Sequence, residues 1–266
     1  MTASPRVQTP ADGIAWVTGA STGIGRATAL ELVRRGWTVA ATARTPETLE
    51  ALAAEAGGRI IAAPCDVTDT AAVYALVERL EAAHGPIALA FLNAGMSIHA
   101  VAPKIDPDVV RRIYDLNVHG VFNGIGALLP RMAGRRSGQI AICASVAGFG
   151  GLPRSTAYSS SKAAMISTAV GLAIECAPLG VLVQCVNPGY VDTPLTKKNR
   201  FPMPFIVTAE EAGRRCAAGF ARGRFEITFP RRFSYLIKAI NLLPYGLYIR
   251  LVRWGTARGL SREPPV

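Results

Sequence analysis

This chain of 266 residues has few histidines, and its cysteines do not have the spacing of a metal site. The three histidines are scattered and the five cysteines form no C-x-x-C pair, so we expect no metal site. Cys65, Cys143 and Cys185 stand in apolar runs typical of strands, where cysteine is usually a small buried residue. This cysteine usage fits a reducing compartment, so we expect a cytoplasmic location, with peripheral attachment to a membrane as an open question.

Charge is also low over most of the chain. Charged residues make up 18% and hydrophobic residues 50%, which excludes a disordered polymer and suits one α/β domain with a sizeable core. Residues 1–12 are polar, contain proline and lack an apolar signal region, and we expect them to form a loose arm.

Long hydrophobic runs are rare, and the longest one is interrupted. Residues 163–186 are apolar over a length that could span a bilayer, but Glu175, Pro178 and Gly180 break the run. We therefore expect a helix that ends near Ala177 and a buried strand that follows it.

Strand-type and helix-type patterns alternate along the chain. Strand-type runs fall at 14–18, 37–43, 59–63, 88–92, 139–144, 181–186 and 225–229. Helical periodicity falls at about 24–35, 46–56, 70–84, 107–132, 156–177 and 208–222. This alternation predicts a Rossmann-type α/β fold, a doubly wound parallel sheet of about seven strands with helices on both faces.

Three glycines stand where the first predicted strand meets the first predicted helix. Gly19, Gly23 and Gly25 have the spacing G-x-x-x-G-x-G. Glycine is needed where φ is positive or where a ligand must approach the backbone closely. The N–H groups and the positive helix end at such a turn attract a pyrophosphate. The turn therefore predicts a nucleotide site, with an ordinary glycine-rich turn as the alternative.

Tyr158 and Lys162 are four residues apart, and Ser145 precedes them by thirteen. On a helix, this spacing places the phenol and the ammonium on one face. A nearby cation lowers the pKa of a phenol from its ordinary value of about 10, which makes an acid/base pair plausible. The alternative is a surface helix with an exposed tyrosine and a solvated lysine.

Several further motifs stand in register with these. They are Thr18-Gly19-Ala20-Ser21-Thr22-Gly23-Ile24-Gly25, Asn93-Ala94-Gly95, Asn117, Ser145, Tyr158-x-x-x-Lys162 and Pro188-Gly189-Tyr190-Val191-Asp192-Thr193. With these motifs, between residue 14 and about 195, the chain resembles a short-chain dehydrogenase/reductase. The resemblance implies an oxidoreductase that interconverts a ketone or aldehyde and an alcohol with a nicotinamide cofactor.

The resemblance implies a role for each catalytic residue. Ser145 would hydrogen-bond the substrate oxygen, and Tyr158 would donate a proton to it. Lys162 would lower the Tyr158 pKa and bind the nicotinamide ribose. Asn117 would hold a water that relays protons to Lys162, unless it only satisfies nearby backbone groups.

The resemblance also places the cofactor beyond the carboxyl ends of the strands. Asp66 would bind the adenine amino group, and Asn93 would lie along the adenine ribose. The implied cofactor-binding residues are Gly19, Ser21, Thr22, Gly23, Ile24, Gly25, Arg44, Asp66, Val67, Asn93, Ala94, Gly95, Tyr158, Lys162, Pro188, Gly189, Val191 and Thr193.

Arg44 bears on which nicotinamide cofactor is used. An NAD site has an acidic residue near the end of the second strand, and here Ala43 stands at that position with Arg44 after it. A guanidinium binds a 2′-phosphate strongly, so we expect NADP(H) to be preferred. Thr22 stands where some NADP-preferring members have a second basic residue, and NAD(H) remains the alternative.

Net charge is concentrated in the carboxyl-terminal quarter. Residues 197–266 carry 14 basic and 4 acidic side chains, whereas residues 1–196 are nearly balanced. We divide the chain into the arm 1–12, a catalytic domain 13–230 and a basic amphipathic extension 231–266. The extension has two apolar stripes, which could pack on the domain or a sister subunit, or attach to an anionic membrane surface through 231–254. Nucleic acid is an unlikely partner, because basic charge is its only support.

The loop at about 194–207 is strongly apolar near its end, over residues 201–206. We expect this loop to line the substrate site, which favours a small apolar or lipid-like carbonyl or alcohol, although it could equally be a flap that packs on the protein. The resemblance further implies a homo-oligomer, a dimer or tetramer. The rival function is a catalytically idle NADP-binding sensor or peripheral membrane scaffold.

Overall fold

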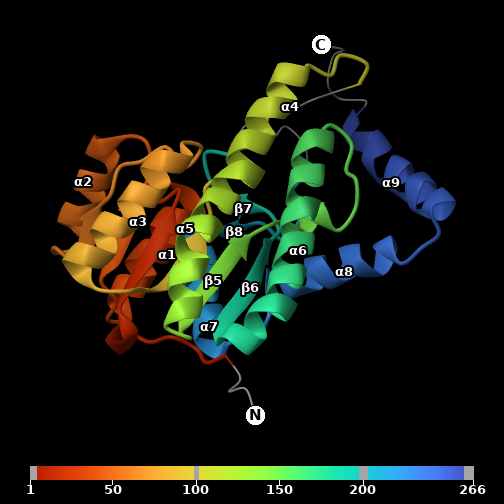
Figure 1. Cartoon of the computed structure of the whole chain (residues 1–266). Coiled ribbons are helices and arrows are strands. Elements are labelled where there is room, and N and C mark those ends of the chain that lie inside the picture. The colour runs from red at the N-terminus through yellow and green to blue at the C-terminus, as the bar shows by residue number, and fades with distance from the viewer. Residues whose placement is uncertain (1–4, 99–101, 198–202, 261–266) are drawn as a thin grey trace.

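A parallel sheet forms the centre of the molecule (Figure 1). The computed structural model describes residues 5–98, 102–197 and 203–260. The strands of the main sheet are β1 Ile14–Thr18, β2 Val39–Thr42, β3 Ile60–Ala62, β4 Ile87–Leu92, β5 Gly138–Cys143, β6 Val181–Pro188 and β9 Glu226–Phe229. Their order is β3-β2-β1-β4-β5-β6-β9, and every pair is parallel. The chain reverses its direction across the sheet between β1 and β4, where open α/β sheets bind ligands.

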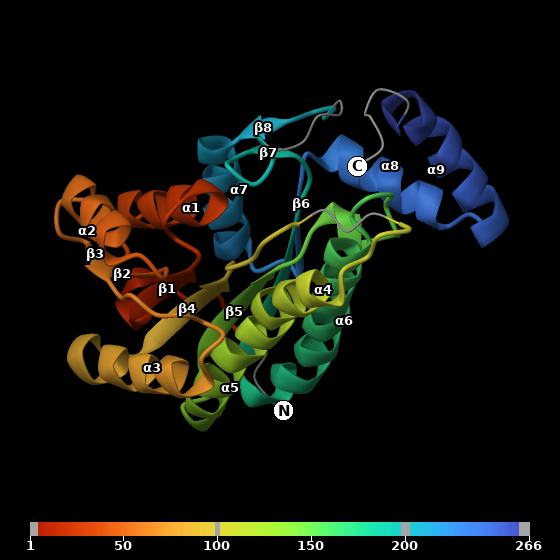
Figure 2. The same cartoon turned by 90° about the horizontal axis from the view of Figure 1, so that it is seen from above.

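Helices cover both faces of this sheet, as Figure 2 shows from above. One face carries α1 Gly23–Arg34, α2 Pro46–Glu55 and α7 Ala209–Arg222, and the other carries α3 Thr70–His84, α4 Pro107–Tyr114, α5 Gly120–Gly134 and α6 Thr156–Cys176. Side chains alternate between the two cores: Trp16 belongs to one and Val17 to the other, and both are fully buried. The predicted fold class and all seven strands are confirmed.

The helix expected over 107–132 is interrupted. α4 ends at Tyr114, a π-helical turn spans Asp115–His119, and α5 begins at Gly120. Asn117 lies in this turn. Single π turns inside helices frequently occur at functional sites, because the extra residue redirects side chains.

The interrupted apolar run folds as expected. α6 ends at Cys176, and the buried strand β6 begins at Val181 after a tight turn. By length and composition, the segment Thr156–Leu179 is the one part of the described chain that could cross a membrane. One side of it packs against β5 and β6 and carries the buried Lys162, while Val170 and Ile174 on this helix are exposed.

The amino-terminal arm is not loose over its described part, which corrects the expectation. Gln8 is buried, and its backbone N–H donates to Oε1 of Gln139 at 2.9 Å. Arg6 forms an ion pair with Asp12 at 2.6 Å. Residues 6–12 therefore lie against the amino end of β5, because a glutamine 131 residues away supplies the partner that the arm needs.

The carboxyl-terminal extension is helical, as predicted. α8 Arg231–Asn241 and α9 Tyr245–Leu260 form a pair that projects beyond the β9 edge of the sheet, on the right of Figure 1. We call residues 231–260 the C-terminal hairpin. A separate two-stranded sheet, β7 Val191–Asp192 with β8 Val207–Thr208, closes the base of the predicted substrate loop, of which residues 198–202 lie outside the described ranges.

Candidate active site

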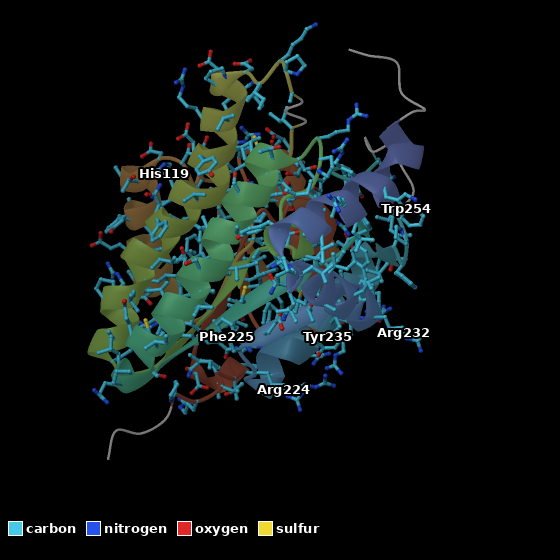
Figure 3. The ribbon with its side chains drawn as sticks, turned by 90° about the vertical axis from the view of Figure 1, so that its right-hand side faces the viewer. His119, Arg224, Phe225, Arg232, Tyr235 and Trp254 are labelled. Carbon is cyan, nitrogen blue, oxygen red and sulfur yellow. The ribbon has the colours of Figure 1, made fainter. Side chains whose placement is uncertain are left out.

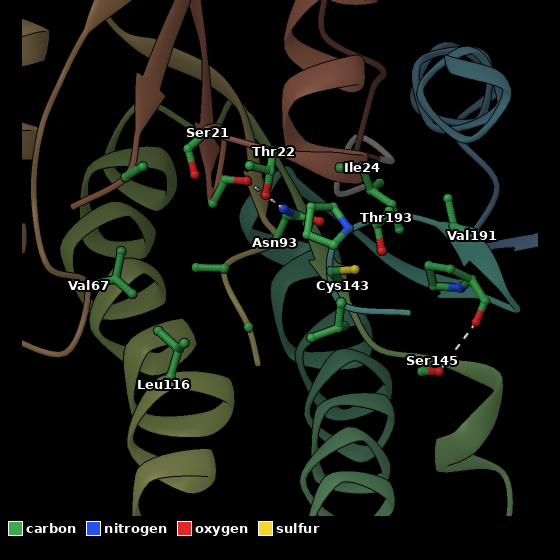
Figure 4. Close-up of a pocket in the computed structure, with 18 of the residues that line it drawn as sticks. Ser21, Thr22, Ile24, Val67, Asn93, Leu116, Cys143, Ser145, Val191 and Thr193 are labelled. Carbon is green, nitrogen blue, oxygen red and sulfur yellow. Dashed lines mark hydrogen bonds between the residues drawn. The ribbon is translucent and has the colours of Figure 1, made fainter. Parts of the chain in front are cut away.

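A cleft of about 310 Å³ opens at the carboxyl ends of the central strands (Figure 4). It brings together all but two of the residues that the sequence singled out. Those lining it are Gly19, Ser21, Thr22, Gly23, Ile24, Arg44, Asp66, Val67, Asn93, Ala94, Gly95, Ser145, Tyr158, Lys162, Pro188, Gly189, Val191 and Thr193. The other two, Gly25 and Asn117, lie directly behind this lining.

The glycine turn is built so closely that side chains are excluded. Gly19 and Gly23 have φ values of +67° and +57°. A Cβ on Gly25 would lie 2.2 Å from the Gly19 carbonyl oxygen, and one on Gly19 would lie 2.8 Å from Cα of Ala94. Backbone therefore forms this wall of the cleft, directly before the amino end of α1. That cradle fits a pyrophosphate, which binds to bare N–H groups at a helix N-terminus.

Asn93 ties the ends of β1 and β4 together. Its Nδ2 donates to the carbonyl oxygens of Thr18 at 3.0 Å and Gly19 at 3.3 Å, as Figure 4 shows in part. In return, Oγ1 of Thr18 accepts from the backbone N–H groups of Asn93 and Ala94. These bonds fix the ends of β1 and β4 relative to each other, at the point where the chain reverses its direction across the sheet.

Arg44 and Asp66 lie at the outer end of the cleft. Arg44 is exposed and follows β2, with Ala43 half-buried before it. A hydrogen bond from the Thr68 backbone lowers the pKa of Asp66, and the Arg44 charge lowers it further. One oxygen of Asp66 accepts both bonds from Thr68, at 2.9 and 2.8 Å. The expected carboxylate and guanidinium thus lie at one end of a single cleft.

Ser145, Tyr158 and Lys162 meet at the inner end. Burial raises the pKa of Tyr158 to about 12, and the Ser145 hydroxyl opposes that rise. The ammonium of Lys162 is buried, donates to the Cys143 carbonyl oxygen at 2.8 Å, and lies 5.8 Å from the centre of the Tyr158 ring. Burial lowers the pKa of Lys162 itself.

Burial thus raises the pKa of Tyr158 overall, and the expectation that Lys162 lowers it stays a prediction. The ammonium is directed to a backbone carbonyl, and loss of water from around the phenol outweighs the opposing effects. Tyr158 is consequently a neutral phenol across the physiological pH range.

Asn117 is fully buried behind the cleft, and the protein itself uses its side chain. Its Oδ1 accepts from the Met96 N–H at 2.8 Å, and its Nδ2 donates to the Met96 carbonyl oxygen and to Ser161, each at 3.0 Å. A Cβ on Gly95 would lie 3.1 Å from Oδ1 of Asn117 and 3.4 Å from Nζ of Lys162. Asn117 thus fixes the segment after β4 against α6 beside Lys162; the water relay stays a prediction.

Ten further residues of the lining were not among the predicted catalytic and cofactor-binding residues. Three of them, Pro194, Leu195 and Thr196, belong to the loop that was expected to line the substrate site. The other seven are Thr42, Ala43, Thr45, Cys65, Leu116, Cys143 and Ala144. Most adjoin a motif or end a strand, so the rule that ligands bind at strand ends could have found them. Cys65 is only half-buried, which corrects its assignment to the core, whereas Cys143 and Cys185 are buried as expected.

Aromatic rings from three segments gather beside the inner end. The rings of Tyr190 and Phe205 lie 5.4 and 6.3 Å from that of Phe233 on α8. Gly189 lies close against Phe233, since a Cβ there would come within 3.1 Å of the ring. On α9, the Tyr248 hydroxyl donates to the Gly151 carbonyl oxygen at 2.9 Å. The hairpin therefore braces two loops that carry cleft residues.

Comparison with known proteins identifies the family. The sequence pattern of the family described as short chain dehydrogenase matches residues 13–203, and the chain belongs to that family of oxidoreductases. An uncharacterized oxidoreductase of Myxococcus xanthus (strain DK1622) is 37% identical over 237 residues, which are 88% of this chain and 94% of that protein.

Two further proteins extend the comparison. The 3-oxoacyl-[acyl-carrier-protein] reductase FabG of Thermotoga maritima is 34% identical over 185 residues, 68% of this chain and 75% of its own. The crystal structure of a short-chain dehydrogenase from Streptomyces avermitilis superposes with a TM-score of 0.77 at 28% identity, covering 93% of this chain and 99% of that one.

Proposed function

We propose that this chain is an NADP(H)-dependent oxidoreductase that interconverts a ketone or aldehyde and an alcohol, with an apolar or lipid-like substrate. One observation carries the proposal: a single cleft joins a glycine turn, at the amino end of a helix, to a protonated tyrosine, a serine hydroxyl and a buried lysine. Fold alone would not support a function, since one fold hosts many.

The residues of the cleft fit a dinucleotide from end to end. The glycine turn would hold the pyrophosphate, Asp66 the adenine, and Arg44 a 2′-phosphate. When bound, the nicotinamide supplies the hydride in reduction or accepts it in oxidation. The protein would position the substrate and transfer one proton to or from its oxygen.

Tyr158 would manage that proton. In reduction, its hydroxyl gives the proton to the substrate oxygen, and the resulting phenolate is then reprotonated from solvent. In oxidation, the phenolate takes the proton back. A phenol that stays neutral at physiological pH suits the donor role.

Ser145 and Lys162 would support Tyr158. The Ser145 hydroxyl donates to the Pro188 carbonyl oxygen at 3.3 Å in this structure, and it would donate to the same substrate oxygen as Tyr158. Lys162 would stabilise the phenolate once it forms, since its buried ammonium lies 5.8 Å from the centre of the Tyr158 ring.

Apolar surroundings support an apolar substrate. Leu195 lines the cleft, and Phe205 and Ile206 lie exposed on the loop between β7 and β8. The Thermotoga relative is named for reduction of a 3-oxoacyl group, a carbonyl on an apolar chain. These features favour a carbonyl with a hydrocarbon neighbour over a sugar.

A catalytically idle NADP-binding sensor or membrane scaffold is the second candidate. To bind NADP without catalysis, such a protein would need only the glycine turn and Arg44 in its cleft. Burying the ammonium of Lys162 costs free energy, and nucleotide binding by itself does not require it. The buried ammonium therefore favours the enzyme.

We further propose a homo-oligomer. Apolar side chains of α5 and α6 remain exposed, among them Phe122, Val170 and Ile174. Light scattering of the purified chain tests this: a mass near 28.1 kDa, the mass of one chain, would contradict it.

The first experiment is a fluorescence titration of the purified protein with NADPH and with NADH. We expect NADPH to bind at least tenfold more tightly, because a charge-assisted bond to the 2′-phosphate contributes about 1.5–3 kcal/mol. Equal or tighter binding of NADH would contradict the NADP preference, and binding of neither would contradict the proposed enzyme.

Replacement of Arg44 tests the residue responsible. Arg44→Ala should weaken NADPH binding by about 10- to 100-fold and leave NADH binding nearly unchanged. Arg59→Ala, an exposed arginine outside the cleft, is the matched control and should change neither. Equal loss for both cofactors in Arg44→Ala would assign the 2′-phosphate to another residue.

A further inference from the structure

The C-terminal hairpin leaves an unusual amount of apolar surface uncovered. Leu242 is 87% exposed, Tyr245 84% and Trp254 69%. Leu242 and Leu243 lie in the turn between the two helices, and the large apolar side chains exposed on the helices also include Tyr235, Leu236, Leu247, Ile249 and Leu251. Monomeric proteins rarely expose so many large apolar groups in one place unless that surface binds something.

This surface is held in a fixed position by the domain. Phe233 and Tyr248 are buried and contact the aromatic cluster and Gly151. Lys238 forms an ion pair with Glu226 of β9 and lies 4.9 Å from the Phe149 ring. One side of each helix therefore packs against the domain. The rest of the hairpin projects outward, and its apolar side chains stay exposed (Figure 3).

The charge around the exposed apolar groups has one sign. Residues 227–262 contain no aspartate or glutamate. Arg231, Arg232 and Arg250 are exposed. Lys238 forms an ion pair with Glu226. Figure 3 shows Arg232, Tyr235 and Trp254 on this outward side of the molecule.

We propose that the C-terminal hairpin docks on a membrane surface that contains anionic lipid, with both helices lying in the interface. Arginines on the helices match anionic headgroups, tyrosine and tryptophan suit the boundary, and the leucines near the helix–helix turn enter the hydrocarbon. With 11 and 16 residues, α8 and α9 are both shorter than the roughly 20 apolar residues that cross a bilayer.

Charge separates this partner from the other occupants. A second copy docked through the same surface would bring two acid-free cationic patches together, and their repulsion opposes the contact. A nucleic acid would match the arginines but would leave Leu242, Leu243 and Leu247 without a role. An anionic bilayer offers headgroups that pair with the arginines and hydrocarbon that covers the exposed leucines.

The test is flotation of the full chain with vesicles, at 50 mM NaCl. We expect binding to vesicles of phosphatidylcholine with 30% phosphatidylglycerol, and much weaker binding to phosphatidylcholine alone. Leu242→Ser with Tyr245→Ser should lower the partition ratio at least about tenfold, since each side chain loses buried apolar area. Arg232→Glu with Arg250→Glu should lower it by more than about fivefold for each residue.

Matched controls lie on the far side of the domain. Tyr74→Ser removes an exposed aromatic group from α3, and Arg59→Glu with Arg79→Glu reverses two exposed charges near β3 and α3. Neither should change binding. Far-ultraviolet circular dichroism and NADPH affinity confirm that each variant is folded, so failure of the proposed enzyme activity leaves this test intact.

Three outcomes would overturn the proposal. One is no flotation with either vesicle, and another is equal loss of binding in the controls. The third is a hairpin variant that keeps full vesicle binding but dissociates a dimer in light scattering, which would assign the surface to a second copy.

Discussion

Tyr158 is a half-buried phenol that lines the cleft, and burial raises its pKa. With a pKa of about 12, Tyr158 is protonated at neutral pH, so the phenol that reduction needs is abundant and the phenolate that oxidation needs is scarce. The two directions of the proposed reaction therefore differ in their dependence on pH.

We expect kcat/KM for reduction to show no loss from Tyr158 between pH 6 and about 10, because the phenol stays protonated throughout. For oxidation, the phenolate is needed, and its fraction rises about tenfold for each pH unit below the pKa. Initial rates in both directions across this range would check the prediction. An alkaline decline of the reductive kcat/KM centred near pH 8 would contradict it.

Replacing Tyr158 by phenylalanine removes only the hydroxyl. Loss of a positioned proton donor should lower kcat by about 10²–10⁴-fold, while NADPH affinity changes little. The paired readouts are single-turnover kinetics and the fluorescence titration. Retained turnover would assign the proton to another group.

The glycine turn between β1 and α1 depends on close contacts between backbone segments. In Gly25→Ala, the added Cβ would lie 2.2 Å from the Gly19 carbonyl oxygen, so the turn must shift. We expect a loss of about 1–3 kcal/mol in the free energy of unfolding, together with weaker NADPH binding. Thermal unfolding and the titration measure the two effects.

Gly171→Ala in α6 is the matched control, because a Cβ there meets nothing within 4 Å and φ is not positive. It should raise the free energy of unfolding by about 0.5–1 kcal/mol, since alanine favours a helix interior more than glycine does. Equal losses in the two variants would contradict the close-contact argument.

Elements with a local signature could be predicted from the sequence. The strands are short apolar runs, and the glycine turn joins a strand to a helix, so their positions follow from neighbours in the chain. The π-helical turn at Asn117 has no such signature, because its helical periodicity continues on both sides.

Contacts between distant segments could not be predicted in the same way. Lys162 bonds the Cys143 carbonyl, and Gln8 bonds Gln139, because the fold brings these groups together. The pKa of Tyr158 likewise depends on burial, and sequence spacing alone suggested the opposite direction. The motif thus predicted residues that meet in one cleft, but not the burial that raises the pKa of Tyr158.

At the scale of the whole molecule, the C-terminal hairpin contacts a segment that adjoins the candidate active site. Tyr248 of α9 donates to the carbonyl of Gly151, in the segment that follows Ser145. The end of the chain therefore helps to fix a loop near its middle.

Tyr248→Phe tests this link by removing the bond and keeping the ring. We expect a loss of about 0.5–1.5 kcal/mol in the free energy of unfolding and a higher KM for the carbonyl substrate, with the NADPH affinity unchanged. Tyr245→Phe changes a tyrosine that is almost fully exposed and should have no effect. If Tyr248→Phe also left KM unchanged, the hairpin would not influence the substrate side.

The position of β9 at the sheet edge has a consequence for synthesis of the chain. A ribosome makes β6 about 40 residues before β9, and in the finished sheet β9 covers the outer edge of β6. Until β9 emerges, the apolar strand Val181–Pro188 has a row of unpaired N–H and C=O groups that another nascent chain could join. A premature stop between Pro188 and Glu226 would make that exposure permanent, so such fragments should aggregate even though they contain every proposed catalytic residue.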